Sequence, residues 1–147
     1  MVVVKWLVMA AAVAPFAAAE FSLTIANPVA AQIAVTKTVG LAVRAEGCAD
    51  LSKATITASA TRIESGARVS IPLGVAKAEA PGVFGVAVAS RPGSWVFVIT
   101  GDCQGAKAGA IVPMPERGPY DRDKVKLFPH APTESEIGAA LREGGAK

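Results

Sequence analysis

The chain has 147 residues, of which 52% are hydrophobic and 18% charged, and its formal net charge is +3. This length is enough for one domain with a hydrophobic core. Its basic residues are scattered among acidic ones, without a concentrated basic face, stacking aromatic residues or a polybasic stretch. We therefore expect no binding to nucleic acid or to a membrane surface.

Residues 1–19 have the three-part pattern of a secretory signal peptide. Lys5 precedes an apolar run from Trp6 to Phe16, and three alanines at 17–19 provide the small side chains that signal peptidase reads. The apolar run is short for a bilayer span, and no stop-transfer segment follows. We expect cleavage after residue 19, export to the periplasm or the cell exterior, and no membrane association afterwards.

The first half of residues 20–113 predicts strands. Residues 21–25 alternate between apolar and polar side chains, a weaker extended piece covers 33–36, and another strand begins at Gly40. Residues 54–63 and 68–75 predict a hairpin whose turn contains Gly66, and Pro72 indicates a sheet edge or a bulge. Four polar side chains of the first arm are expected to face solvent: Thr55, Thr57, Ser59 and Thr61.

The second half of this region predicts another hairpin, 83–89 with 94–100, around Pro92-Gly93. Residues 95–99 are apolar at every position, which indicates a central strand covered on both sides, or on one side by another sheet. Trp95 within it is expected in the core, with a ligand-stacking surface as the alternative. A last short strand is expected at 108–112.

Together these patterns predict an all-β fold, an antiparallel immunoglobulin-like β-sandwich of seven or eight short strands with an extended C-terminal tail and a short helix. Residues 20–113 would form the sandwich and residues 114–147 the tail. The expected core residues are Leu23, Ile25, Leu41, Val43, Ile56, Val69, Ile71, Phe84, Val86, Trp95, Phe97 and Ile99.

The cysteines of the chain are Cys48 and Cys103. In an exported protein an even number of cysteines favours a disulfide, and two unpaired buried thiols are the alternative. Asp50 and Asp102 each lie within two residues of a cysteine. They are candidates for a weak cation site at that rim, with solvated loop carboxylates as the alternative. No close pair of ligands typical of zinc is present, and we expect no resident metal.

The tail is rich in proline and charge. We expect it to be extended as far as residue 132 and then to form a helix of about ten residues, capped by Thr133 and ended by a glycine pair. A short amphipathic helix needs a docking surface, on its own domain or on a partner. The candidate residues for partner binding are Tyr120, Phe128, Ile137 and Leu141.

Catalysis is not expected. The single histidine, His130, lies in the proline-rich tail, where a base is hard to hold beside a nucleophile, and a solvated loop histidine is the simpler interpretation. The acidic residues lie mostly beside turns rather than as paired carboxylates. The glycines do not form a phosphate-binding motif. We therefore predict no enzyme activity and no cofactor.

Two segments, PGVFGV at 81–86 and PGSWVFV at 92–98, resemble the late strands of bacterial immunoglobulin-like envelope modules, including YtkA-like and carboxypeptidase-regulatory-like domains. The resemblance covers residues 54–103 and implies a sandwich scaffold. Here the tryptophan lies just before the second cysteine, unlike in antibody domains. Some YtkA-like domains handle copper through Met and His ligands, of which the exported chain offers Met114 and His130.

Our leading functional hypothesis is an exported, non-enzymatic module that binds a protein or another envelope component through a sheet edge or the helix. The alternative is a small-molecule or metal-ion binding protein that uses the rim near Cys48 and Cys103. An enzyme of unrecognised type is the third hypothesis.

Overall fold

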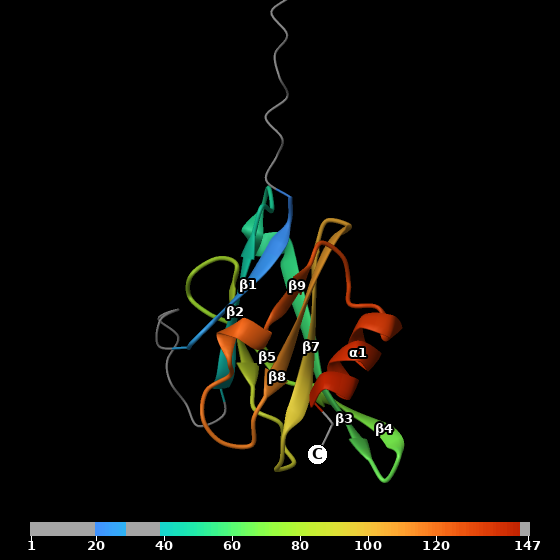
Figure 1. Ribbon diagram of the computed structural model, residues 1–147. Coiled ribbons are helices and arrows are strands. Elements are labelled where there is room, and N and C mark those ends of the chain that lie inside the picture. The colour runs from blue at the N-terminus through green and yellow to red at the C-terminus, as the bar shows by residue number, and fades with distance from the viewer. Residues whose placement is uncertain (1–19, 29–38, 145–147) are drawn as a thin grey trace, which may run out of the picture.

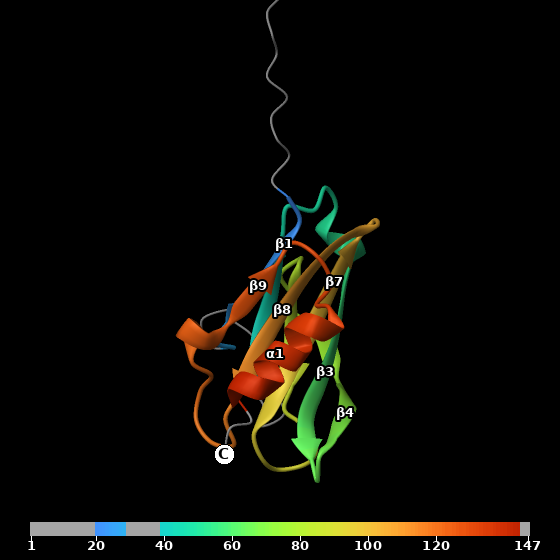
Figure 2. The ribbon, with the colours of Figure 1, turned by 45° about the vertical axis from the view of Figure 1, so that its right-hand side comes forward.

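The computed structural model describes residues 20–28 and 39–144. Two antiparallel sheets pack face to face, and one helix forms a third layer (Figures 1 and 2). The four-stranded sheet has the order β1-β2-β6-β5 and the five-stranded sheet the order β4-β3-β7-β8-β9. The predicted signal peptide and the extended piece at 33–36 lie outside the described residues.

The elements have the following bounds: β1 Ser22–Ala26, β2 Val39–Glu46, η1 Leu51–Lys53, β3 Ala54–Glu64, β4 Ala67–Leu73, β5 Val75–Lys77, β6 Val83–Ala87, β7 Trp95–Cys103, β8 Ala106–Met114, η2 Arg122–Lys124, β9 Lys126–Phe128 and α1 Glu134–Gly144. If β1 to β8 are lettered A, B, C, C′, D, E, F and G, the sheets read A-B-E-D and C′-C-F-G. This is the strand order of immunoglobulin-type sandwiches. The predicted fold class is confirmed, and β9 adds one further strand.

The hairpin of β3 and β4 is confirmed. Its two turn residues, Ser65 and Gly66, both have positive φ angles, 51° and 80°, as a type I′ turn requires. β4 lies at the edge of its sheet. Pro72 is therefore on an edge strand, as its missing backbone donor predicted. Val75, which was expected to continue this arm, begins β5 in the other sheet.

The predicted hairpin of 83–89 with 94–100 is wrong. β6 belongs to the four-stranded sheet and β7 to the five-stranded sheet, so residues 88–94 form a crossover segment between sheets. A proline-glycine pair marks a change of direction, but it does not say whether the two arms pair with each other. The alternation of Phe84, Val86 and Val88 along the first arm predicts that Val88 faces inward, but it lies in the crossover segment and is 44% exposed.

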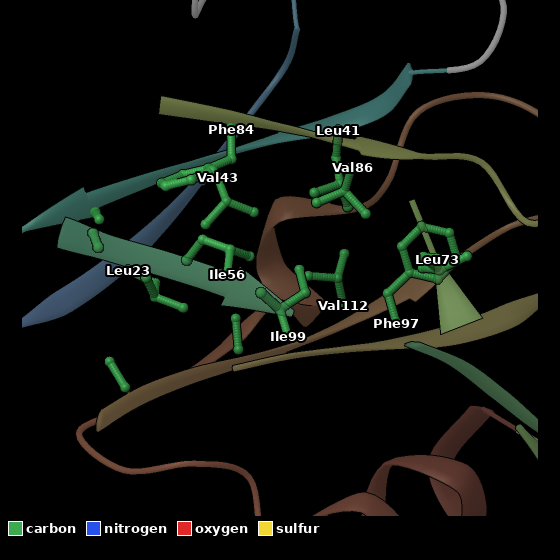
Figure 3. Packing of buried hydrophobic residues seen from close by; sticks show 14 of the residues in the cluster. Leu23, Leu41, Val43, Ile56, Leu73, Phe84, Val86, Phe97, Ile99 and Val112 are labelled. Atoms are coloured by element: carbon green, nitrogen blue, oxygen red, sulfur yellow. The ribbon is translucent and has the colours of Figure 1, made fainter. Parts of the chain in front are cut away.

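The core fills the space between the sheets. Figure 3 shows Leu41, Val43, Phe84 and Val86 on one side and Ile56, Phe97, Ile99 and Val112 on the other. Ile25, Val69 and Ile71 are half-buried, and the other residues predicted for the core are buried.

β7 is the central strand of its sheet, covered on both faces as predicted. Its outer face and that of β8 lie under α1 (Figure 2). There Ile137, Ala140 and Leu141 pack against Val96 and Ile111. The apolar spacing on the helix is thus satisfied within its own domain.

The predicted solvent exposure of Thr61 is wrong, because its side chain is fully buried. Thr61 pairs with Val96 of β7, in the part of the sheet that the helix covers. Its hydroxyl donates to the carbonyl oxygen of Val69 at 3.1 Å and accepts from the hydroxyl of Ser70 at 3.0 Å. Thr55 and Thr57 are exposed and Ser59 is half-buried.

The C-terminal segment docks on the sandwich. β9 pairs with β8, and α1 begins at a capping box in which Thr133 Oγ1 accepts from the N–H of Glu136 while Glu136 Oε1 accepts from the N–H of Thr133. β8 has a glycine where the segment passes: a Cβ on Gly109 would lie 2.3 Å from Pro132 Cδ. Among the described residues, no helix is long and apolar enough to cross a membrane.

Candidate functional site

The predicted disulfide between Cys48 and Cys103 is formed; the two Cα atoms are 6.1 Å apart, and the cysteines are 55 positions apart in sequence. Cys48 follows β2, and Cys103 is the last residue of β7. Since β2 and β7 belong to different sheets, the bond joins the two sheets at one end of the sandwich. We call this the disulfide end.

The two carboxylates proposed for a cation site already have partners close to them in sequence. Asp50 Oδ1 accepts from the N–H of Ser52 at 3.0 Å and caps η1. Asp102 forms an ion pair with Lys107 and accepts from the N–H of Gly105 at 3.2 Å. The Lys107 ammonium, and next the Gly105 N–H, lower the pKa of Asp102. No group of three or more His, Cys, Asp or Glu residues in the described part of the chain is placed to hold a metal ion.

A shallow groove of about 560 Å³ lies beside the disulfide. Its lining includes Arg44, Glu46, Cys48, Leu51 and Pro81, but neither of the two proposed aspartates. This groove therefore presents one charge of each sign rather than a carboxylate pair.

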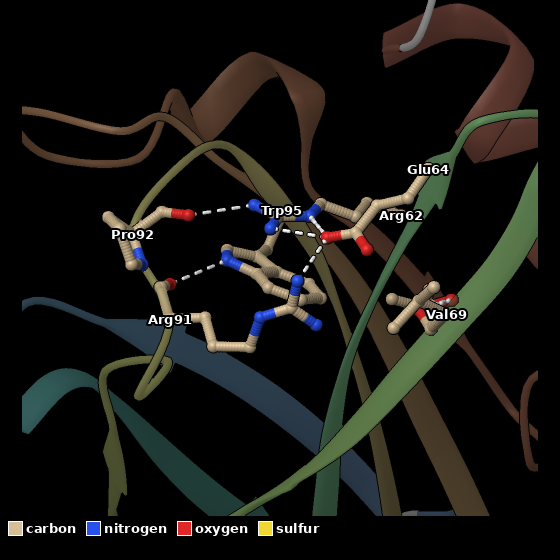
Figure 4. Close-up of polar contacts among 7 residues, drawn as sticks. Arg62, Glu64, Val69, Arg91, Pro92 and Trp95 are labelled. Carbon is tan, nitrogen blue, oxygen red and sulfur yellow. Dashed lines mark hydrogen bonds and ion pairs between the residues drawn. The ribbon is translucent and has the colours of Figure 1, made fainter.

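The opposite end of β7 begins at Trp95, which is 3% exposed and packs in the core, as predicted. The Cζ atom of Arg62 lies 3.9 Å from the centroid of the Trp95 ring, and that of Arg91 lies 5.9 Å away. Figure 4 shows both guanidinium groups beside the indole. Guanidinium groups, rather than an open stacking surface for a ligand, therefore lie beside the ring.

Glu64 joins these two arginines. Its Oε1 accepts from Arg62 Nε at 2.7 Å and from Arg91 Nη2 at 2.8 Å (Figure 4). These two bonds, the one from Arg62 being the larger cause, lower the pKa of Glu64. We call Arg62, Glu64, Arg91 and Trp95 the Arg–Trp cluster.

The cluster also holds the crossover segment. Trp95 Nε1 donates to the carbonyl oxygen of Arg91 at 2.9 Å, and Arg62 Nη1 donates to that of Pro92 at 2.8 Å (Figure 4). Sequence reasoning missed the cluster, because Arg62 on β3 and Arg91 in the crossover meet only through the tertiary fold. The one local signal is the spacing of Arg62 and Glu64, which puts both side chains on the same face of a strand.

The residues proposed for partner binding in the tail lie against their own domain. Tyr120 is 9%, Ile137 5% and Leu141 8% exposed, and Phe128 is half-buried. His130 is on the surface, with Nε2 2.9 Å from Glu136 Oε1. In this arrangement the tail presents few of its apolar side chains to a partner.

The longest edge strand of the two sheets is β4, with seven residues against three to five for β1, β5 and β9. In a hairpin with a two-residue turn, the two residues that flank the turn form a hydrogen-bonded pair, and hydrogen-bonded pairs then alternate with non-hydrogen-bonded pairs along the strands. Here the flanking pair is Glu64 with Ala67. The register therefore turns the backbone groups of Arg68, Ser70 and Pro72 away from β3. A proline fits at 72 for this reason, since its nitrogen has no bond to donate to β3.

Comparisons with protein-family models, with curated proteins and with solved structures find no match to this chain. The functional conclusion therefore rests on the geometry of the described residues.

Proposed function

We propose that the chain is an exported, non-enzymatic β-sandwich module that binds a protein of the envelope or the exterior by adding a strand of that partner to β4. One observation carries the proposal: β4 is a seven-residue strand that, in the described part of the chain, has a sheet neighbour on one side only. Its outward N–H groups at Arg68 and Ser70 and its outward carbonyls are the groups that strand addition uses.

The other edges support strand addition less well. β5 and β9 have three residues each, and β1 packs against β8 and β9 of the other sheet. On β4 the residues facing away from the core include a charged residue, Arg68, and a proline, Pro72. Such residues restrict indiscriminate pairing of edge strands. Strand addition at β4 would therefore select a partner strand that accommodates Arg68 and Pro72.

The test compares two substitutions at one position. Ser70→Pro removes the outward N–H together with the hydroxyl bond to Thr61, whereas Ser70→Ala removes the hydroxyl bond alone. A tagged chain is crosslinked in intact cells, and the captured proteins are identified by mass spectrometry. We expect Ser70→Ala to retain the specific partner and Ser70→Pro to lose it.

The comparison requires both variants to be folded, and an unfolding curve of each variant checks this. Capture of the same partner by Ser70→Pro would overturn binding at β4. Equal loss of capture in the two variants would also contradict it, because the N–H is present in one of them. Export is tested separately by the mass of the protein recovered outside the cytoplasm, which should begin at Glu20.

A second candidate function is binding of a small molecule or metal ion at the rim near Cys48 and Cys103. It is favoured by the groove of about 560 Å³ beside Cys48. Calorimetry with divalent cations and the variants Asp50→Asn and Asp102→Asn tests the metal form of this function. If no heat of binding is measured at millimolar cation concentrations, metal binding at this rim is excluded. Uncharged or zwitterionic molecules then remain as candidate ligands of the groove.

A further inference from the structure

A second groove, of about 440 Å³, lies at the end of the sandwich opposite the disulfide. We call it the crossover groove, because the crossover segment forms one wall and the end of β8 with the following loop forms the other. Its lining includes Val88, Arg91, Pro92, Met114, Glu116 and Arg117. The volume is within the range of roughly 300–1,000 Å³ that small-molecule sites occupy.

The wall formed by the crossover segment is held in place before any ligand arrives. The hydrogen bond from Trp95 to the Arg91 carbonyl and that from Arg62 to the Pro92 carbonyl fasten two successive residues. Gly93 has a φ angle of 118°, and a Cβ there would lie 2.3 Å from Arg62 Nη1. A fixed wall reduces the ordering that binding requires.

Two guanidinium groups at this groove have donors to spare. Arg91 uses Nη2 for Glu64, and its side chain is 49% exposed. Arg117 has no hydrogen-bond or ion-pair partner among the described residues. The opposing charges are Glu116 in the lining and Glu64 in the cluster, so three arginines face two carboxylates when Arg62 is included. The groove therefore has a net charge of +1 beside an apolar lining.

We propose that the crossover groove binds the carboxylate end of an amphipathic molecule. Arg117 and Arg91 would donate to the carboxylate, as guanidinium groups do in paired hydrogen bonds. The apolar part of the molecule would lie against Val88, Pro92 and Met114. Both the C-terminus of an apolar peptide and a medium-chain fatty acid have this chemistry. The inference is independent of strand addition, since the groove lining contains no residue of β4.

Two matched pairs of probes test the proposal on the whole exported chain. One pair is an acetylated, leucine-ending tripeptide with a free carboxylate and the same peptide as its amide; the other is octanoate and octanamide. Binding is followed by the backbone N–H signals of Gly93 and Trp95 in nuclear magnetic resonance spectra. We expect a saturable shift at millimolar carboxylate and about tenfold weaker binding of each amide. The carboxylate that binds more tightly shows whether the groove prefers a peptide C-terminus or a fatty acid.

Arg117→Gln is the principal variant, because within residues 20–28 and 39–144 the side chain of Arg117 has no hydrogen-bond or ion-pair partner whose loss would disturb the fold. It should weaken carboxylate binding about tenfold. Arg142→Gln on α1 makes the same change of charge on an exposed residue outside the groove lining and should leave binding unchanged. Equal binding of acid and amide, equal binding by Arg117→Gln and wild type, or no saturable shift would each overturn the proposal. Ser70→Pro should bind the probes as wild type does, which separates this site from β4.

Discussion

The two ends of the sandwich are fastened by different chemistry. At the disulfide end a covalent bond joins the segment after β2 to the last residue of β7. At the other end Arg62 and Trp95 hold the crossover segment by hydrogen bonds and by a cation–π contact of 3.9 Å. At each end, one of the joined residues lies in a segment that passes from one sheet to the other. Both sets of interactions therefore oppose separation of the two sheets.

The difference between the ends bears on function. At the disulfide end Asp50 binds a group of its own loop, and Asp102 binds Lys107 on the neighbouring strand β8. At the Arg–Trp end Arg91 and Arg117 retain donors, beside a groove whose wall is already ordered. The donors that we propose for ligand binding therefore lie at the end that is held without a covalent bond.

Removing the disulfide should have the largest effect on stability. For a bond that closes a 55-residue loop, the chain-entropy model gives about 4 kcal/mol. We expect the double variant Cys48→Ala, Cys103→Ala to lose about that free energy of unfolding in urea titrations. A loss under about 1 kcal/mol would mean that the Arg–Trp end and the core hold the sheets together without the bond.

Substitution of Gly93 should weaken the opposite end by less. Ala at a φ angle of 118° is strained, and its Cβ would displace Arg62 from the Pro92 carbonyl. We expect Gly93→Ala to lower the free energy of unfolding by about 1–3 kcal/mol. The control is Gly74→Ala, whose Cβ would meet only the Cβ of Ala87 at an ordinary 3.7 Å. Equal losses in the two variants would contradict a special role for the crossover segment.

Local patterns predicted much of the fold. The β3–β4 hairpin follows from the conformational freedom of Gly66, β7 from an apolar run too continuous for a half-exposed strand, and the disulfide from two cysteines in a chain that the sequence predicts to be exported. The helix follows from its cap at Thr133 and its apolar spacing. Apart from the cysteine pair, each of these signals is contained in a short stretch of sequence.

The predictions that failed concern which elements pair or pack with each other. The Pro92-Gly93 signal marks a reversal, but β6 and β7 found partners in different sheets. Thr61 alternates as a solvated position should, but it is buried beside Val96, on the face of the sheet against which α1 packs. The site is subject to the same limit: the core position of Trp95 was predictable, whereas its stacking with Arg62 and the groove beside Arg117 are products of tertiary contacts.

The start of α1 belongs to neither the disulfide end nor the Arg–Trp cluster, so a substitution there provides a reference for the stability effects at the two ends. Thr133→Ala removes the side-chain half of the capping box and should lower the free energy of unfolding by about 1 kcal/mol. Ser135→Ala, at an exposed position in the first turn, is the control and should change it little. Faster hydrogen exchange at the N–H of Ile137 should accompany the loss. If the exchange at Trp95 accelerated equally, the helix and the Arg–Trp end would not be separate units.

Acidification should distinguish the two ends by the smallest effect. The pKa of Glu64 is held below its ordinary value of 4.5 by Arg62 and Arg91, and that of Asp102 below 3.8 by Lys107. A carboxylate with a lowered pKa stabilises the fold above its ordinary pKa, and this stabilisation is lost as pH falls through the lowered value. Glu64→Gln and Asp102→Asn should each make the free energy of unfolding less dependent on pH below about pH 4.5. After acidification the disulfide still joins the sheets at the Asp102 end, whereas protonation of Glu64 releases Arg91 from its carboxylate partner. Hydrogen exchange in acid should therefore accelerate at Trp95 before it does at Cys103, and the reverse order would show that the covalent end is the weaker one.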